Sequence, residues 1–290
     1  NLDNMLAYIE VNITKTEAGT SDKLLTTKVP PPIIFPRQGI YHPALPNLII
    51  NDLSAYKNLR PVKDQQAKIA VLLQRALIET EQTQLIDATI AQLEEKGAYV
   101  VPFFFELSPV SGDYSRLLQL PITEKNSTEK NSAGESFSMR TDVDLIINFR
   151  NIHWANKRKV EFEKFNVPVM HAMTYYSGDK ETWENDKQGV SANMMSFTLV
   201  LPETAGVIEP TIVAAMDPKT GIVQIIDYQL EFLLDRALAH ANLVKKVNSE
   251  KKLTLMFWGD KDMGASFLNV PDSLRAISQR LNQDGYTLEA

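Results

Sequence analysis

The sequence has 290 residues, about two domains' worth, and is 44% hydrophobic and 23% charged, as is typical of a folded globular protein. Its formal net charge is −6, and an acidic chain lacks the basic footprint of a nucleic-acid-binding protein. The absence of cysteine excludes disulfides, thiolate zinc sites, iron–sulfur clusters and cysteine nucleophiles. No apolar run approaches the roughly 18 residues that a membrane-spanning helix needs, so we expect no transmembrane segment.

The two ends of the sequence predict that it is a piece of a longer protein. It starts with Asn1 rather than methionine, and no signal-peptide pattern opens it. It stops at Ala290, just after Gly285, within what reads as the start of a strand.

Residues 1–61 predict an N-terminal segment and an irregular connector that wraps a larger body. Six prolines fall within 17 positions of this segment, and such a run favours extended backbone and discourages helix. They are Pro30, Pro31, Pro32, Pro36, Pro43 and Pro46.

Residues 62–250 predict an α/β domain with an open, mostly parallel sheet and flanking helices, of the Rossmann or flavodoxin-like class. Its expected strands are continuous apolar runs, as buried parallel strands are, and its expected helices carry apolar residues with a period near 3.6. The strands are expected over 68–74, 98–105, 143–147, 167–172 and 207–215, and helices over 154–165 and 226–244.

The first strand–helix–strand unit of this domain has the clearest signals. Ile86, Ile90 and Leu93 have helical spacing, and Gly97 stands where a helix often ends. The second apolar run follows at once, so we expect a right-handed crossover between two parallel strands.

Two further segments have patterns of their own. Within residues 121–141 the motif Thr-Glu-Lys-Asn-Ser occurs twice in succession, and this polar, aperiodic composition predicts a mobile surface insertion. Residues 251–290 predict the start of a second α/β module, with a strand over 253–258 and a helix over 271–282.

Nucleotide-binding motifs are missing. No two glycines lie two residues apart, so the Gly-x-Gly-x-x-Gly fingerprint is absent. Gly259 and Gly264 have the spacing of a phosphate-binding loop, but Ala265 stands where that loop needs lysine. If ATP is used, another subunit must hydrolyse it.

Five residues remain as candidates for chemistry. Glu203 and Glu209 lie in restrained turns after an apolar run, where a carboxylate could accept protons or hold a hard cation. His171 and Arg75 are expected at the carboxyl ends of strands, where α/β folds meet ligands, and His42 follows the proline run. The alternatives are that the two glutamates are solvated loop acids, that Arg75 forms a structural salt bridge and that the histidines are structural. The four histidines are too scattered to predict a metal site.

The order of several motifs resembles the large subunit of the cobalt and magnesium chelatases, the CobN/magnesium-chelatase H family. The resemblance covers roughly residues 33–290. It is carried by Gly-Ile-Tyr-His-Pro at 39–43, Val-Leu-Leu-Gln-Arg at 71–75, Ile-Ala-Gln-Leu-Glu-Glu-Lys-Gly at 90–97, Asn-Val-Pro-Val at 166–169, Leu-Pro-Glu-x-x-Gly-x-Ile-Glu-Pro at 201–210 and Leu-Asn-Val-Pro-Asp-Ser-Leu at 268–274.

This resemblance implies a tetrapyrrole-binding subunit that inserts a divalent metal into a corrin or porphyrin-type macrocycle. It implies that ATP enters only through separate AAA+ ATPase partner subunits, and that the protein is cytoplasmic. On this basis Glu203 handles protons or metal, with Glu209 second. Arg75 meets a carboxylate or amide of the tetrapyrrole, and His42 and His171 contact the metal or the macrocycle.

The motifs leave the metal open, with cobalt first. Ile-Glu-Pro resembles the magnesium branch, whereas Gly-Ile-Tyr-His-Pro and Asn-Val-Pro-x-Ser-Leu resemble the cobalt branch. Thr204 and Ala205 replace the usual Leu-Asp after Glu203, so one acid is missing. There are two alternatives. One is magnesium insertion into protoporphyrin, and the other is iron removal from haem by a periplasmic protein of the HmuS-type haem-uptake branch. A tetrapyrrole carrier without catalysis is the competing class.

Overall fold

The computed structural model describes residues 5–10, 35–45, 49–105, 117–123, 129–130, 136–256 and 269–287. The chain divides into two compact units, Asn1–Arg37 and Gln38–Ala290. In the first unit, residues 5–10 are helical. The second unit contains every element described below. None of the helices in the described residues is long and apolar enough to cross a membrane.

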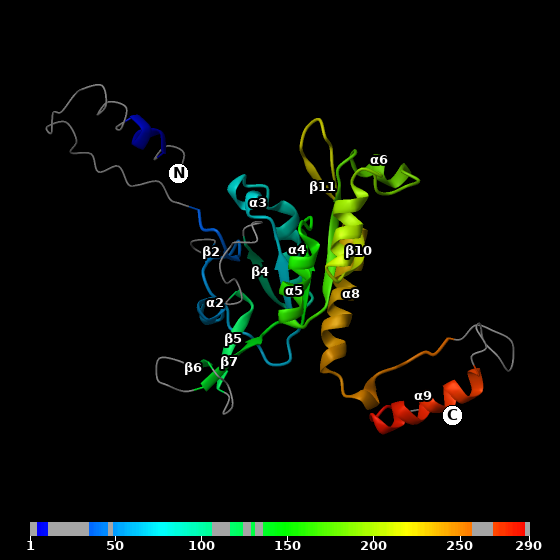
Figure 1. The fold of residues 1–290 in the computed structure, drawn as a ribbon. Coiled ribbons are helices and arrows are strands. Elements are labelled where there is room, and N and C mark those ends of the chain that lie inside the picture. Colours follow the sequence, from blue (N-terminus) through cyan, green and yellow to red (C-terminus); the bar gives the residue numbers. More distant parts are fainter. Residues whose placement is uncertain are drawn as a thin grey trace. The chain divides into compact units, whose positions relative to one another are not determined.

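An open, mostly parallel sheet forms the centre of the second unit (Figure 1). Five strands run parallel in the spatial order β4-β3-β8-β9-β10, which is the 2-1-3-4-5 order of flavodoxin-like folds. Every residue of β4 and β8 is buried, because helices cover both faces. The predicted fold class is therefore confirmed. The strands are β3 (Lys68–Leu72), β4 (Tyr99–Phe104), β8 (Leu145–Asn148), β9 (Val169–Tyr175) and β10 (Val207–Met216).

Antiparallel strands extend this sheet at both edges. β11 (Val223–Ile225) pairs with β10, while β1 (Gly39–Tyr41) pairs with β4 and with β2 (Ile49–Ile50). Residues 38–61 therefore belong to the α/β unit, whereas the sequence predicts a boundary after residue 61. Prolines near this strand hide it in the sequence, but Gly39 lets β1 lie close to both of its neighbours: a Cβ there would lie 2.6 Å from Ile49 of β2 and 3.3 Å from Phe104 of β4.

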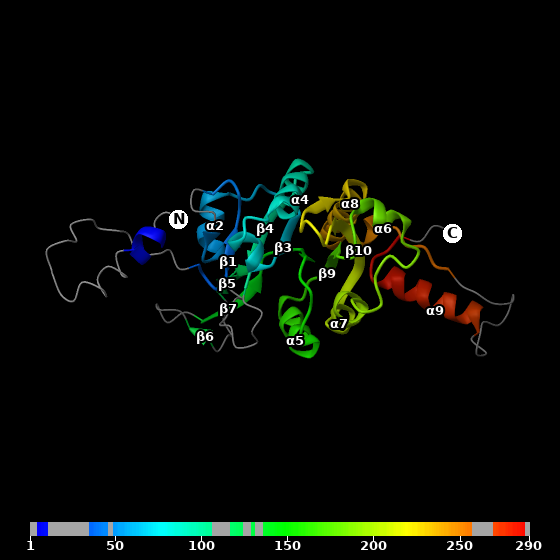
Figure 2. The same ribbon diagram turned by 90° about the horizontal axis from the view of Figure 1, so that it is seen from above.

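Helices lie on the two faces of the sheet (Figure 2). On one face, α4 (Gln84–Glu95) and α8 (Asp227–Lys245) contact each other and the strands. On the other, α5 (Ala155–Phe165) contacts α7 (Leu201–Thr204). The shorter helices are α2 (Leu53–Leu59), α3 (Arg75–Glu79) and α6 (Lys180–Asn185), with the π-helix η2 (Ser196–Val200) and the 3-10 helix η3 (Asn248–Glu250).

The predicted helix before Gly97 forms for the expected reason. Ile86, Ile90 and Leu93 are buried against the sheet, which confirms the apolar stripe. Gly97 has φ 86°, and the Ala98 N–H donates to the Leu93 carbonyl, so a left-handed glycine ends the helix.

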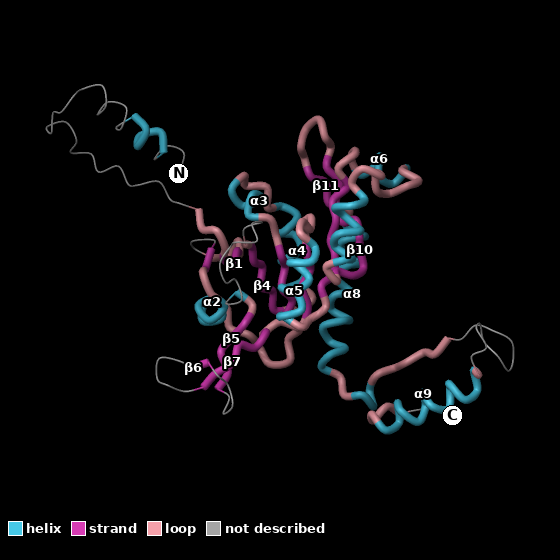
Figure 3. The backbone as a smooth tube through the Cα atoms, in the orientation of Figure 1, coloured by secondary structure: helices cyan, strands magenta, loops and turns pink. Residues whose placement is uncertain are grey.

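Part of the predicted surface insertion is regular sheet (Figure 3). β5 (Gln119–Thr123), β7 (Ser136–Thr141) and β6 (Glu129–Lys130) form a separate antiparallel sheet in the order β5-β7-β6. The polar composition of residues 121–141 does not prevent these strands, because backbone pairing does not require an apolar pattern. That the insertion is mobile stays a prediction. Residues 124–128 and 131–135 lie outside the described residues.

The region after α8 differs from its prediction. Residues 251–256 are irregular and mostly exposed, so the strand expected over 253–258 is absent from its described part. An apolar run becomes a strand only where a partner supplies hydrogen bonds, and no described strand lies beside it. The expected helix is α9 (Val270–Gln283). The side chain of Asn269 caps its amino end by accepting a hydrogen bond from the Asp272 N–H.

Candidate functional site

The strand order places a ligand crevice between β3 and β8. The chain leaves β3 toward α4 on one face of the sheet and leaves β8 toward α5 on the other. The carboxyl ends of these two parallel strands therefore diverge, and open α/β sheets bind ligands at such a point. The residues that follow Leu72 and Asn148 are the first candidates for a site.

Asn148 is the fully buried last residue of β8 and organises this edge. Its Oδ1 accepts from the Arg150 N–H at 3.2 Å, and its Nδ2 donates to the Arg150 carbonyl at 2.8 Å. The same Nδ2 lies 3.0 Å from Nδ1 of His171, which is its register partner in β9. The side chain thus fixes both the β8–α5 loop and a buried imidazole.

His171 is buried at the third position of β9. The sequence predicts it at the carboxyl end of that strand, so its position within the strand differs from the prediction. Its Nδ1 contacts Asn148, but its Nε2 has no hydrogen-bond partner in the part of the chain that the structure describes. Burial lowers the pKa of His171 to about 4, so its imidazole is neutral at pH 7. The backbone of Thr198 in η2 acts on the His171 ring and opposes the lowering of its pKa.

A narrow cavity opens beside Asn148 at the end of β8, and its walls include Phe105, Arg150 and Arg158. Both guanidinium groups stack on the Phe105 ring, at 4.4 Å for Arg150 and 5.0 Å for Arg158. Arg150 also donates to the Phe105 carbonyl at 3.0 Å, and Arg158 forms an ion pair with Glu161. These contacts make the inner wall of the crevice rigid and positively charged.

Aromatic rings form the outer part of this edge. The His153 ring lies 5.9 Å from the Trp154 ring and 5.4 Å from the Phe197 ring, measured between centroids. Trp154 has φ 55°, a left-handed conformation that costs a bulky residue roughly 1–3 kcal/mol. The site therefore combines a buried imidazole and amide, a charged wall and exposed rings.

Arg75 lies at the same edge, three residues after the end of β3. It is the first residue of α3 and forms an ion pair with Glu79 at 3.1 Å, one helical turn away. The sequence predicts Arg75 at the end of the strand, whereas β3 ends at Leu72 and Arg75 lies on α3 just beyond it. Its contact with tetrapyrrole stays a prediction.

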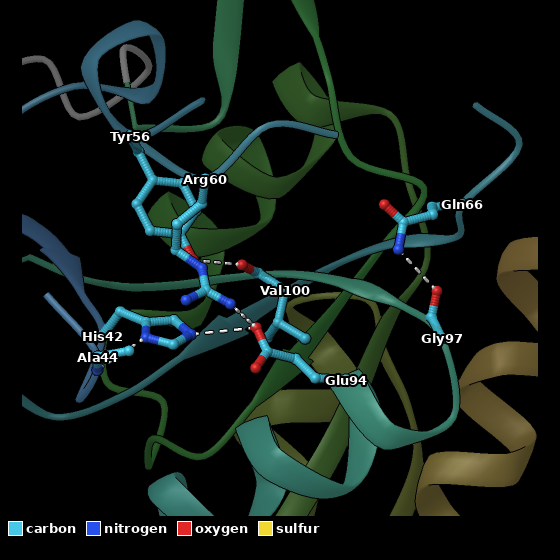
Figure 4. Close-up of polar contacts among 8 residues, drawn as sticks. All are labelled: His42, Ala44, Tyr56, Arg60, Gln66, Glu94, Gly97 and Val100. Carbon is cyan, nitrogen blue, oxygen red and sulfur yellow. Dashed lines mark hydrogen bonds and ion pairs between the residues drawn. The ribbon is translucent and has the colours of Figure 1, made fainter. Parts of the chain in front are cut away.

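His42 lies at the opposite edge of the sheet, near the amino end of β4 (Figure 4). The Ala44 N–H donates to its Nδ1 at 3.1 Å, so its Nε2 carries the proton and donates to Glu94 at 3.1 Å. Glu94 also accepts from Arg60. Burial, followed by the Arg60 charge, lowers the pKa of His42. Both ring nitrogens of His42 are thus engaged, and Glu94 of α4 contacts both His42, which follows β1, and Arg60, which ends α2.

Glu209 lies in the first half of β10, where the pairing with β9 shifts register. Arg236 of α8 donates twice to its carboxylate, and His240 contacts Oε1 at 2.9 Å. Donation from Arg236 lowers the pKa of Glu209 to about 2, which makes the carboxylate a poor proton acceptor. Its φ of 51° marks a bulged backbone that this contact with α8 holds.

Glu209→Gln should therefore lower the free energy of unfolding by about 1 kcal/mol at pH 7, as for a half-exposed ion pair. The folded pKa lies below the ordinary 4.5, so this stabilisation exists above pH 4.5 and is lost as the pH falls toward 2. Urea unfolding at pH 7, 5 and 3 measures it. Glu184→Gln, at an exposed position of α6, is the control. A Glu209→Gln deficit that is as large at pH 3 as at pH 7 would refute the ion-pair explanation.

Glu203 is exposed on α7, a single helical turn just before β10. Because β10 is parallel to the other central strands, this turn lies at the amino edge of the sheet. The structure thus brings His171 and Arg75 toward the carboxyl edge, and leaves His42, Glu209 and Glu203 elsewhere. Their roles in catalysis and binding remain predictions.

Sequence reasoning missed the residues that build the crevice. Asn148 and Arg150 directly follow a predicted strand, and polar residues at that place were a usable signal. His153 and Trp154 gave no signal, because the ring contact between His153 and Phe197 joins residues 44 positions apart. In the described residues no group of three or more His, Cys, Asp or Glu side chains could hold a metal ion.

The fold and this edge define an open α/β domain of flavodoxin-like strand order with a ligand crevice at its switch point. The CobN/Magnesium Chelatase family model matches residues 1–290. The chain therefore belongs to the CobN/magnesium chelatase family.

Three known proteins illustrate the similarity. The chloroplastic magnesium-chelatase subunit ChlH of Oryza sativa subsp. indica is 31% identical over 308 residues, covering 100% of this chain and 21% of that protein. The aerobic cobaltochelatase subunit CobN of Pseudomonas aeruginosa is 22% identical, over 89% of this chain and 20% of its own. The solved catalytic subunit of cobaltochelatase from Mycobacterium tuberculosis shares the fold, with a TM-score of 0.66 and 18% identity over 99% of this chain and 22% of that one.

Proposed function

We propose that this chain is part of the tetrapyrrole-binding large subunit of a metal chelatase, which inserts a divalent metal, cobalt first, into a corrin or porphyrin-type macrocycle. The family match over the whole chain carries the proposal. The chain spans about a fifth of the length of the curated relatives it matches, so the activity belongs to a larger protein.

Metal insertion sets chemical demands that the candidate residues can meet. Two pyrrole N–H protons must leave the macrocycle, and the metal must lose its water ligands. Carboxylates can accept protons and bind cations transiently, and neutral imidazoles can bind transition metals. Glu203 is our candidate for proton or metal handling. The carboxylate of Glu209 forms an ion pair with Arg236, whereas none of the described contacts pairs the carboxylate of Glu203 with an arginine.

Cobalt is our first choice for the metal and magnesium the second. His171 offers a neutral imidazole, which suits cobalt, whereas magnesium prefers oxygen ligands. The 31% identity to a magnesium-chelatase subunit favours magnesium and keeps it as the second candidate.

ATP would enter through separate AAA+ partner subunits, because the sequence lacks a phosphate-binding loop with its lysine. We therefore propose a cytoplasmic location for the assembly. Acid–base and metal-binding residues of the large subunit would then act on the macrocycle while the partners supply energy.

The test uses the full-length protein with its ATPase subunits. A metal-free corrinoid and protoporphyrin are each incubated with Co²⁺ or Mg²⁺, with and without ATP, and metal gain is followed by absorption spectroscopy. In a separate incubation haem is the only tetrapyrrole, and its spectrum reports iron loss. We expect ATP-dependent cobalt insertion into the corrinoid. Magnesium insertion would favour the second candidate. Iron loss from haem, or tetrapyrrole binding without metal exchange, would overturn the proposal in favour of a dechelatase or a carrier.

A further inference from the structure

Three aromatic side chains gather on the surface at the carboxyl edge of the sheet. Trp154 is 53% exposed and Phe197 is 40% exposed, and the His153 ring contacts both. They come from the β8–α5 loop and from η2, which are distant in sequence. The fold therefore assembles an exposed patch of rings beside the crevice between β3 and β8.

Trp154 is poorly suited to its local structural position. It is the residue before the first turn of α5, yet its side chain caps no backbone N–H, and its backbone is left-handed. Asparagine would both cap the helix and tolerate this backbone better. An exposed indole at a strained position does not stabilise the fold, so its presence indicates a role in ligand binding.

The segment that carries Phe197 provides a second observation. η2 is a π-helix, a rare element that is frequent at functional sites. It lies by the buried His171, whose Nε2 has no hydrogen-bond partner in the described part of the chain. A rare backbone form and an unsatisfied buried nitrogen thus occur together next to the exposed ring.

We propose that His153, Trp154 and Phe197 form the surface on which the flat face of the tetrapyrrole macrocycle stacks. This inference rests on the proposed function and names its binding surface. Large apolar ring systems gain dispersion and burial by packing on aromatic faces. The loops directly after β3 and β8 contain no glycine, so they offer no phosphate cradle, and a macrocycle fits this edge better than a nucleotide.

The test measures binding of a water-soluble metal-free porphyrin to the full-length protein by fluorescence titration. Trp154→Asn removes the indole and keeps a residue that suits the left-handed cap, so folding is preserved. Phe197→Leu removes the second ring and keeps an apolar side chain. Phe232→Ala removes an equally exposed ring, at 54%, from α8 on the other face of the sheet.

We expect the dissociation constant to rise at least about tenfold in Trp154→Asn and in Phe197→Leu, and to stay within about twofold in Phe232→Ala. Trp154→Phe should restore most of the affinity. Wild-type affinity in both Trp154→Asn and Phe197→Leu would overturn the stacking surface and leave the proposed function standing. A wild-type protein that binds no tetrapyrrole would instead overturn the proposed function, and the stacking surface with it.

Discussion

Asn148→Leu is expected to lower the free energy of unfolding by about 3 kcal/mol. Leucine removes both hydrogen bonds between the fully buried Asn148 amide and the Arg150 backbone, and the loss of a partner in a buried hydrogen bond costs about 1–3 kcal/mol. It also removes the amide beside Nδ1 of His171. The melting temperature should fall by roughly 6–12 °C.

Urea unfolding followed by circular dichroism measures this effect. Asn242→Leu, at an exposed position on α8, is the matched control and should change stability by less than about 0.5 kcal/mol. A double-mutant cycle with His171→Leu separates the imidazole contact from the contacts with Arg150. A loss below about 1 kcal/mol in Asn148→Leu would show that this amide does not organise the carboxyl edge.

Glu203→Gln is expected to lower kcat for metal insertion at least about 100-fold in the full-length protein. Glutamine keeps the size of the side chain but cannot accept a proton, and a positioned acid or base contributes about 10²–10⁴-fold to rate. Because Glu203 is exposed on α7 and pairs with no described arginine, the substitution should not disturb the fold. Tetrapyrrole affinity should change less than about twofold.

Steady-state kinetics and porphyrin titration on the same preparations check this expectation. Glu184→Gln removes an equally exposed carboxylate from α6 and should leave kcat unchanged. Unchanged turnover in Glu203→Gln would remove Glu203 from the mechanism. A parallel loss of affinity would assign it to binding instead of proton or metal handling.

The fold was predictable where local pattern and burial agree. The helix α4 follows its apolar stripe and ends at Gly97, and β3, β4 and β8 are apolar runs because they are buried on both faces. The prediction failed where pairing decides structure. β1 forms through backbone contacts with the distant β4, the β5-β7-β6 sheet forms through pairing of polar strands with one another, and residues 253–256 lack a described partner.

The candidate site was predictable only in part. Arg75 lies near the carboxyl edge but on α3 and not on the expected strand, and His171 lies on the expected strand but within it and not at its end. Glu209 resembled a free catalytic acid because its partner Arg236 is 27 residues away, on a helix that packs over β10. Charge compensation of this kind arises from packing, so the sequence could not show it.

By itself, the sequence determined the family, the central parallel sheet and the absence of thiolate and phosphate-loop chemistry, because these depend on residue types and on short-range spacing. Only the tertiary structure decided which of the candidate side chains lie together. It paired Asn148 with His171, engaged His42 and Glu209 with ion partners, and placed Trp154 beside Phe197. The physical reason is that hydrogen bonds, ion pairs and ring contacts depend on distance in space, and strand order sets that distance independently of position along the chain.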